Sequence, residues 1–257
     1  MTDAQIHDKR IELKYMLDAS LSLQVQQWAR EHLGIDRHCN ETLGDSYDVN
    51  TLYLDTPDYD LFHRTGKAGR AKHRIRRYGD EKSLWIETKR KKQNVVRKNR
   101  TAADADEVLS QLSAPDDTSP WCGAWFRDRV VDRNLQPAAQ VHYRRFARTA
   151  TFDGESLRLT IDSNLQASPA QGWLVAAASD PHPPSQRLQA TDSQILELKF
   201  YNHMPHLFKE LLRTFAIPAT GFSKYRTAVQ AWQLDTPVPI SVAPMDQTSE
   251  KDCLANA

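Results

Sequence analysis

Apolar and polar residues alternate with a period of two along several short segments, which is typical of β-strands that bury one face. In residues 9–15, Ile11 and Leu13 alternate with charged residues, and Leu196, Leu198 and Phe200 do the same near the other end of the chain. This alternation predicts eight strands, over residues 9–15, 47–55, 70–78, 83–90, 96–100, 139–149, 157–162 and 194–200.

Between these strands, apolar residues recur at helical spacing. Helices are predicted over residues 16–34, 102–112, 121–135 and 223–234, and one more begins near Pro205, a residue that suits the first helical position. Asp18 or Ser20 is expected to cap the first helix. Residues 166–192 are rich in proline and predict an irregular insertion with one short strand at 173–177. The folded domain is expected over residues 9–234, between flexible ends at 1–8 and 235–257.

The polar face of the predicted strands carries charge rather than neutral polar groups. An open sheet can turn such a face to water, but Lys, Arg and Glu on so many strands favour a sheet that closes on itself. We therefore expect an α+β fold, a closed antiparallel eight-stranded β-barrel that forms a tunnel, with the helices packed on the outside. Its interior should hold the cations Arg10, Lys14, Lys72, Arg74, Arg76, Lys89, Lys98, Arg145, Arg158 and Lys199 and the acids Glu12, Glu87, Asp162 and Glu197.

Charge is distributed unevenly along the chain. The 257 residues have a formal net charge of only +1, yet residues 64–100 contain fifteen Lys or Arg and three Asp or Glu. Adjacent strands would bring like charges together, which is destabilising unless an anion lies between them. Local asymmetry of this kind indicates a polyanionic ligand rather than general attraction to nucleic acid, so no DNA partner is expected.

The sequence also indicates the cellular compartment in which the protein is expected. No run approaches about 18 apolar residues and the N-terminus has no apolar signal region, so neither a membrane segment nor export is expected. Whether the protein has a membrane partner stays open. Cys39, Cys122 and Cys253 are far apart and form neither a disulfide framework nor a metal-binding motif. A reduced, cytoplasmic setting is predicted.

A tunnel with this many cations must hold water and multivalent anions, because burying unneutralised charge costs far more than the roughly 5–15 kcal/mol of a domain's stability. Phosphate chains fit this requirement, since Arg binds phosphate bidentately and Lys acts as a point charge. The acids indicate a hard divalent cation, Mg²⁺ or Mn²⁺, that bridges one or two carboxylates to phosphate oxygens.

Nine short motifs follow one another in a recognisable order. They are RIELKY (10–15), YLDT (53–56), KHRIRRYG (72–79), ETK (87–89), KNR (98–100), YRR (143–145), RLTID (158–162), ELKF (197–200) and SKY (223–225). Together they resemble the VTC domain, the polyphosphate polymerase domain of the vacuolar transporter chaperone family, within the CYTH-like triphosphate tunnel metalloenzymes. The resemblance covers about residues 8 to 232.

The resemblance implies a tunnel that binds ATP or another triphosphate together with polyphosphate and a divalent metal. In the polymerase branch, the terminal phosphoryl group of ATP is transferred to a growing chain. Phosphate binding would then fall to Lys14, Arg74, Arg76, Lys89, Lys98, Arg145, Lys199 and Lys224, joined by the inward-facing Arg10, Lys72 and Arg158. Glu197, with Glu12, would hold the metal, and the candidate catalytic residues are Lys14, Arg74, Arg76, Lys89, Lys199 and Glu197.

The first strand departs from the pattern of the related CYTH hydrolases. Arg10 stands where they carry the first Glu of a Glu-x-Glu-x-Lys motif, so that only Glu12 is left. Fewer carboxylates should weaken a second metal site, which favours transfer or binding over hydrolysis. Three functions stay open: polyphosphate synthesis from a nucleoside triphosphate, hydrolysis of inorganic triphosphate, a nucleoside triphosphate or an RNA 5′-triphosphate, and non-catalytic polyphosphate binding.

Three residues near the basic strands have two interpretations each. Glu87 is either a metal ligand or a carboxylate that orients its cationic neighbours by salt bridges. Tyr78 and Trp85 either stack on a nucleotide base or pack in the core.

Overall fold

A computed structural model of the chain describes residues 10–39, 43–66, 71–92, 95–114, 120–152, 154–181, 183–188, 193–217 and 220–236. The predicted flexible N-terminus and residues 237–257 of the predicted C-terminal tail lie outside the described residues.

The described strands form one antiparallel sheet, and each predicted strand is present. The strand order is β1-β10-β8-β7-β3-β4-β5-β6, while β2 pairs with β7 and β9 pairs with β8. Their bounds are β1 (Arg10–Leu17), β2 (Gly34–Ile35), β3 (Ser46–Asp55), β4 (Ala71–Tyr78), β5 (Ser83–Lys92), β6 (Val95–Asp104), β7 (Gln136–Phe152), β8 (Glu155–Pro169), β9 (Gln186–Arg187) and β10 (Gln194–Tyr201).

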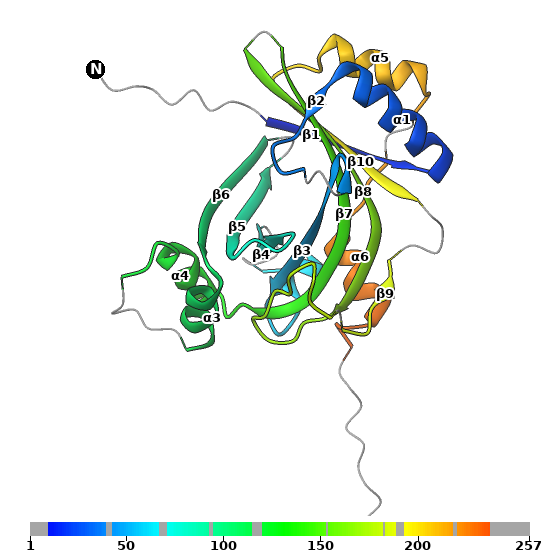
Figure 1. Cartoon of the computed structure of the whole chain (residues 1–257). Helices are drawn as coiled ribbons and strands as arrows, with labels where there is room; N and C mark the ends of the chain where they lie inside the picture. Colours follow the sequence, from blue (N-terminus) through cyan, green and yellow to red (C-terminus); the bar gives the residue numbers. More distant parts are fainter. Residues whose placement is uncertain are drawn as a thin grey trace, which may run out of the picture.

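The sheet curls around a central space, but hydrogen bonds do not close it (Figure 1). Its path begins at β1 and ends at β6, and these two strands are not paired with each other over the residues described. The antiparallel sheet and its tunnel-like curvature agree with the prediction, whereas closure of the barrel is not confirmed. Period-two alternation determines which face of a strand is polar, whereas it carries no information on which edges pair.

Six helices occur in the described part of the chain, and most of them are shorter than predicted. α1 follows Asp18, whose carboxylate accepts a hydrogen bond from the backbone N–H of Leu21 at 2.7 Å, so the predicted cap is confirmed. Pro205 precedes α5 as its N-cap and is not its first helical residue. The bounds are α1 (Ala19–His32), α2 (Asp60–His63), α3 (Ala105–Ser113), α4 (Ala124–Asp132), α5 (His206–Thr214) and α6 (Lys224–Trp232).

Two apolar layers cover the outer face of the sheet. α1 and α5 pack on β1, β8 and β10 through a cluster that includes Trp28, Leu198 and Phe208, and α3 and α4 pack on β3 to β6 through a cluster that includes Ile86 and Phe126. Figure 1 shows these two helix pairs at opposite ends of the molecule. Because both layers lie outside, the charged residues that alternate with these apolar ones face the central space.

α6 is an exception to the prediction that all helices pack on the outside. Its residue Tyr225 is fully buried, with its ring centroid 5.3 Å from that of Tyr53, and Tyr53 lines the central space. The ammonium group of Lys224 lies 4.8 Å from the centre of the Tyr143 ring, which lines the same space. α6 therefore packs against the inner face of the sheet, where the apolar Ala228 and Val229 meet a local apolar cluster.

The predicted insertion at 166–192 is partly regular. β8 continues through Pro169, and no strand forms over 173–177, contrary to the prediction. A side chain satisfies one of the backbone carbonyls of this segment: the amide of Asn50 donates a hydrogen bond to the carbonyl of Ala176 at 2.7 Å. A side chain thus supplies the partner that a neighbouring strand would otherwise provide.

No helix in the described ranges is long and apolar enough to cross a lipid bilayer.

Candidate functional site

The space enclosed by the curved sheet is a cavity of about 2080 Å³, here called the tunnel. Ligand pockets usually measure roughly 300–1,000 Å³, so this cavity exceeds what one small ligand needs. The described residues that line it include fifteen Lys or Arg and two carboxylates, Glu12 and Glu197. The tunnel is therefore a strongly positive environment.

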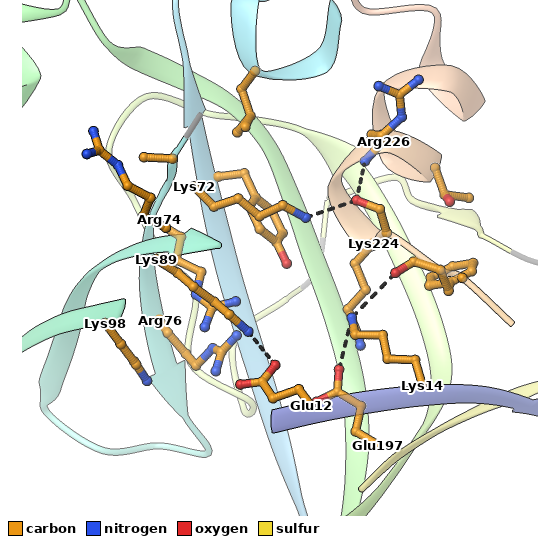
Figure 2. Close-up of a pocket in the computed structure, with 18 of the residues that line it drawn as sticks. Glu12, Lys14, Lys72, Arg74, Arg76, Lys89, Lys98, Glu197, Lys224 and Arg226 are labelled. Atoms are coloured by element: carbon orange, nitrogen blue, oxygen red, sulfur yellow. Dashed lines mark hydrogen bonds and ion pairs between the residues drawn. The ribbon is translucent and has the colours of Figure 1, made fainter. Parts of the chain in front are cut away.

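One wall of the tunnel is formed by β4, β5 and β6. In the strand register Lys72 lies opposite Lys89, and Lys89 lies opposite Lys98, so one row of the wall consists of three lysines. Figure 2 shows these side chains, with Arg74 and Arg76, on one side of the cavity. Such a row is stable only with counter-ions nearby, because like charges directly opposite one another repel.

Glu87 is the fixed counter-ion of this wall. Its carboxylate has no solvent exposure and lies 2.7 Å from Arg74, 2.6 Å from Lys98 and 3.4 Å from Arg100. Burial would raise the pKa of Glu87, but Arg74, Arg76 and Lys98 hold it well below its usual value. Glu87 is thus an ionised group that orients cations, in line with the second of its two interpretations.

The adjoining wall, on β1 and β10, carries the two carboxylates that line the tunnel. Glu197 forms ion pairs with Lys14 at 3.1 Å and with Lys199 at 2.8 Å, and Lys89 donates to Glu12 across the seam where β1 and β6 are not paired (Figure 2). Burial would raise the pKa of Glu12, yet attraction to Lys199 and Lys89 lowers it to about 2. Both carboxylates are therefore ionised at neutral pH.

Asp162 on β8 ties α6 to the tunnel. This fully buried carboxylate accepts hydrogen bonds from Arg145 at 2.6 and 2.8 Å and from Lys224 at 2.6 Å. Lys224 is the first residue of α6, and the cap residue Ser223 accepts a hydrogen bond from Lys72 at 3.1 Å. The start of α6 is thus fixed by contacts to two strands of the tunnel.

Two of the predicted phosphate-binding cations, Arg76 and Lys72, have no carboxylate in ion-pair contact among the described residues. Arg76 is 5 % exposed and donates to the hydroxyls of Thr51 at 3.2 Å and Tyr78 at 3.4 Å, and Lys72 donates to the Ser223 hydroxyl at 3.1 Å. Burial, with the surrounding cations, lowers the pKa of Lys72 to about 7. An anion bound beside Arg76 and Lys72 would supply the missing counter-charge.

A comparison with known protein families identifies the family of this chain. Residues 9–233 match the model of the VTC domain. The chain belongs to the VTC domain family. The motifs that suggested this family from the sequence lie on the tunnel strands and at the start of α6. A search of curated proteins found no match to the chain.

Two solved structures are similar to this VTC domain. A candidate adenylate cyclase from Bacillus halodurans has a TM-score of 0.50 and 14% identity, covering 88% of this chain and 99% of its own. A candidate adenylyl cyclase from Hippeastrum, which has a dominant triphosphatase activity, has a TM-score of 0.47 and 16% identity, covering 90% of this chain and 99% of its own. At 14% identity, the similarity to the Bacillus halodurans protein shows a shared fold and nothing more.

The donor set of this VTC domain fits a hard divalent cation. Glu12 and Glu197 lie on adjacent strands, two residues apart in register, and both face the tunnel. Mg²⁺ and Mn²⁺ are commonly held by one or two carboxylates plus substrate phosphates. No group of three or more His, Cys, Asp or Glu residues in the described ranges could hold a metal by itself, so phosphate oxygens would complete the coordination.

The tunnel brings together nearly all the residues predicted to bind phosphate. Arg158 lines it as well, while its guanidinium pairs with Asp36 at 2.8 Å and donates to the Tyr47 hydroxyl at 2.7 Å. Arg10 begins β1, but its side chain lies outside the described part of the structure. The other predicted phosphate and metal residues all line the tunnel: Glu12, Lys14, Lys72, Arg74, Arg76, Lys89, Lys98, Arg145, Glu197, Lys199 and Lys224.

Sequence reasoning missed several further cations that line the tunnel. Arg100 lies two residues after Lys98 on β6, so both share one face of the strand, and this spacing could have predicted Arg100 as a tunnel residue. For the remaining four, strand alternation does not predict a position in the tunnel, because they lie outside the strands or, like Arg90, directly follow an inward-facing residue. They are Arg64, Arg90, Arg133 and Arg226. Tyr78 lines the tunnel, and Trp85 packs against the core with the Arg100 guanidinium 3.4 Å from its ring centre.

Proposed function

We propose that this VTC domain transfers the terminal phosphoryl group of a nucleoside triphosphate, such as ATP, to the end of an inorganic polyphosphate chain. The observation that carries the proposal is the tunnel of about 2080 Å³ with its wall of Lys and Arg, in which Arg76 and Lys72 pair with no carboxylate of the described residues. This volume suits a nucleotide and a phosphate chain together better than a nucleotide alone.

Positioning and charge carry most of the catalysis of phosphoryl transfer, and the tunnel is suited to both tasks. The buried Glu87 fixes Arg74 and Lys98, and Asp162 fixes Arg145 and Lys224, so these cations are oriented before substrate arrives. Donors fixed in this way lose little freedom when negative charge develops on the transferred group.

In the proposed step, the terminal phosphate oxygen of the chain attacks the γ-phosphorus of the triphosphate. A phosphorus–oxygen bond forms to the chain while the bond to the β-phosphate oxygen breaks, and the nucleoside diphosphate leaves. The attacking phosphate is already ionised at neutral pH, so no general base is needed. This agrees with the described tunnel lining, which contains no His or Cys.

Glu197 and Glu12 are the residues that would hold a divalent metal, Mg²⁺ or Mn²⁺. When bound, such an ion neutralises charge on the phosphate oxygens and favours an in-line geometry. Lys14, Lys89 and Lys199 pair with these carboxylates in the absence of other partners, and they would turn to phosphate once the carboxylates are engaged.

Incubation of the purified protein with ATP and Mn²⁺ or Mg²⁺, followed by a gel that resolves long phosphate chains, tests the proposal. Chains that lengthen with time are expected, and Arg76→Ala should produce none. Release of orthophosphate alone would assign hydrolysis instead. Unchanged ATP together with tight polyphosphate binding would make the tunnel a binding module.

A further inference from the structure

A group of four arginines outside the proposed catalytic machinery lies beside α4. They are Arg90 on β5, Arg97 on β6, Arg129 on α4 and Arg133 at the C-terminal cap of α4, and we call them the rim cluster. Arg90 and Arg97 are exposed and directly opposite one another in the strand register. Directly opposed residues share a face of the sheet, so this pair holds two like charges together.

The rim cluster has no compensating carboxylate in ion-pair contact within the described ranges. The Arg133 guanidinium lies 3.3 Å from the Nε2 atom of His73, which is not a charged partner because burial and the nearby arginines lower the pKa of His73 to about 4. Burial, Arg90 and Arg129 lower the pKa of Arg133, and Asp132 opposes this only in part. The cluster is therefore a patch of unneutralised positive charge.

The rim cluster is continuous with the tunnel. Arg90 and Arg133 are among the residues that line the tunnel, and Arg90 follows Lys89 directly along β5. Because adjacent residues of a strand point to opposite faces, β5 presents cations to the inside at Lys89 and to the outside at Arg90. A polyanion that leaves the tunnel beside Lys89 would meet the rim cluster next.

We propose that the rim cluster binds the part of an inorganic polyphosphate chain that extends beyond the tunnel, so that the domain prefers long chains. This inference rests on the proposed function of the tunnel. A single-stranded nucleic acid is the less favoured ligand, because such ligands are usually held by free aromatic faces on which bases stack. At the rim cluster, Arg129 already lies over the Trp125 ring at 5.0 Å, and the Trp125 indole N–H donates to Thr101 at 2.9 Å.

The test compares three probes: sodium tripolyphosphate, inorganic polyphosphate fractionated to chains longer than the tunnel, and a single-stranded RNA. The wild-type protein should bind the long chain more tightly per molecule. Arg97→Ala/Arg129→Ala, which removes the two members of the rim cluster that do not line the tunnel, should weaken long-chain binding by roughly two- to thirtyfold, as expected for two solvent-accessible charge pairs. Tripolyphosphate affinity should stay within the error of the measurement. The salt dependence of long-chain binding should also become shallower, because fewer counter-ions are released.

The matched control is Lys209→Ala/Arg213→Ala, which removes two exposed cations from α5 at the other end of the molecule (Figure 1). If this control weakened long-chain binding equally, the effect would be one of net charge and the inference would be overturned. Equal losses of affinity for tripolyphosphate and for long-chain polyphosphate in the rim variant would overturn it too. A loss of affinity confined to single-stranded RNA would also overturn it. Failure of tripolyphosphate to bind the wild type would instead refute the proposed function of the tunnel.

Discussion

Lys89 on β5 donates a hydrogen bond to the carboxylate of Glu12 on β1, across the side of the tunnel where the sheet is not closed by backbone pairing. Attraction to Lys199 and Lys89 lowers the pKa of Glu12 despite its burial. The pKa of Lys89 is lowered as well, because burial and Arg74 outweigh the attraction of Glu12. The positive charge that surrounds this pair contributes to both shifts, and burial adds to the shift of Lys89.

Replacing Glu12 by Gln should destabilise the empty protein, because Lys89 loses its counter-ion and the positive excess grows. The expected decrease in the free energy of unfolding is about 1.5–3 kcal/mol, measured by denaturant titration. Glu210→Gln, an exposed carboxylate on α5, is the control and should change little. Saturating polyphosphate should restore much of the loss, since the anion binds only the folded state. No difference between the two variants would argue against a stabilising contact at this seam.

Phosphate affinity should fall as the pH rises above neutrality. Burial, aided by neighbouring cations, lowers the pKa of Lys72, Lys98 and Lys199 to about 7, and a bound polyanion would raise these values again. Below pH 7 the lysines are already protonated and affinity should be constant, whereas above pH 7 binding requires proton uptake. Titrations from about pH 6 to about pH 9 measure this, and Lys72→Arg should flatten the dependence because guanidinium stays protonated. An affinity that increased with pH would contradict the assignment.

Neighbouring arginines on β4 should differ sharply in their effect on binding. Arg76 faces the tunnel and has no carboxylate partner in the part of the chain that the structure describes, while Arg77 faces away and donates to the carbonyl of Glu81. Arg76→Ala should weaken tripolyphosphate binding roughly ten- to a hundredfold without lowering the melting temperature, because it removes an unneutralised charge. Arg77→Ala should leave the affinity nearly intact. Similar losses for both variants in calorimetric titrations would show that the inner face of β4 does not bind the ligand.

Much of this architecture could be predicted from the sequence because charge alternated with apolar residues on almost every strand. The faces of β1, β4 and β10 followed directly from residues such as Lys14, Arg74 and Glu197. The open seam between β1 and β6 and the inward packing of α6 could not be predicted, because alternation does not report which edges meet or which side a helix covers. Tyr225 illustrates this: its hydroxyl contacts Asp55, a residue 170 positions earlier in the chain.

Glu197→Gln should separate a metal ligand from a purely electrostatic partner of Lys14 and Lys199. Burial would raise the pKa of Glu197, but these two lysines hold it well below its usual value, so the wild-type group is ionised. The amide keeps the size but lacks the charge that a hard cation requires. Turnover at a given Mn²⁺ concentration should fall by orders of magnitude while metal-free polyphosphate binding persists or tightens. Near-normal turnover with an unchanged dependence on Mn²⁺ would exclude the ligand role.

The most direct test of phosphoryl transfer follows the reaction of the purified protein with ATP and Mg²⁺ by phosphorus NMR. We expect resonances of internal polyphosphate phosphates to appear as ATP is consumed, with one ADP formed for each phosphoryl group added, and we expect neither product from Arg76→Ala. Orthophosphate as the only new phosphate species, or ATP left unchanged while polyphosphate still binds the tunnel, would contradict it.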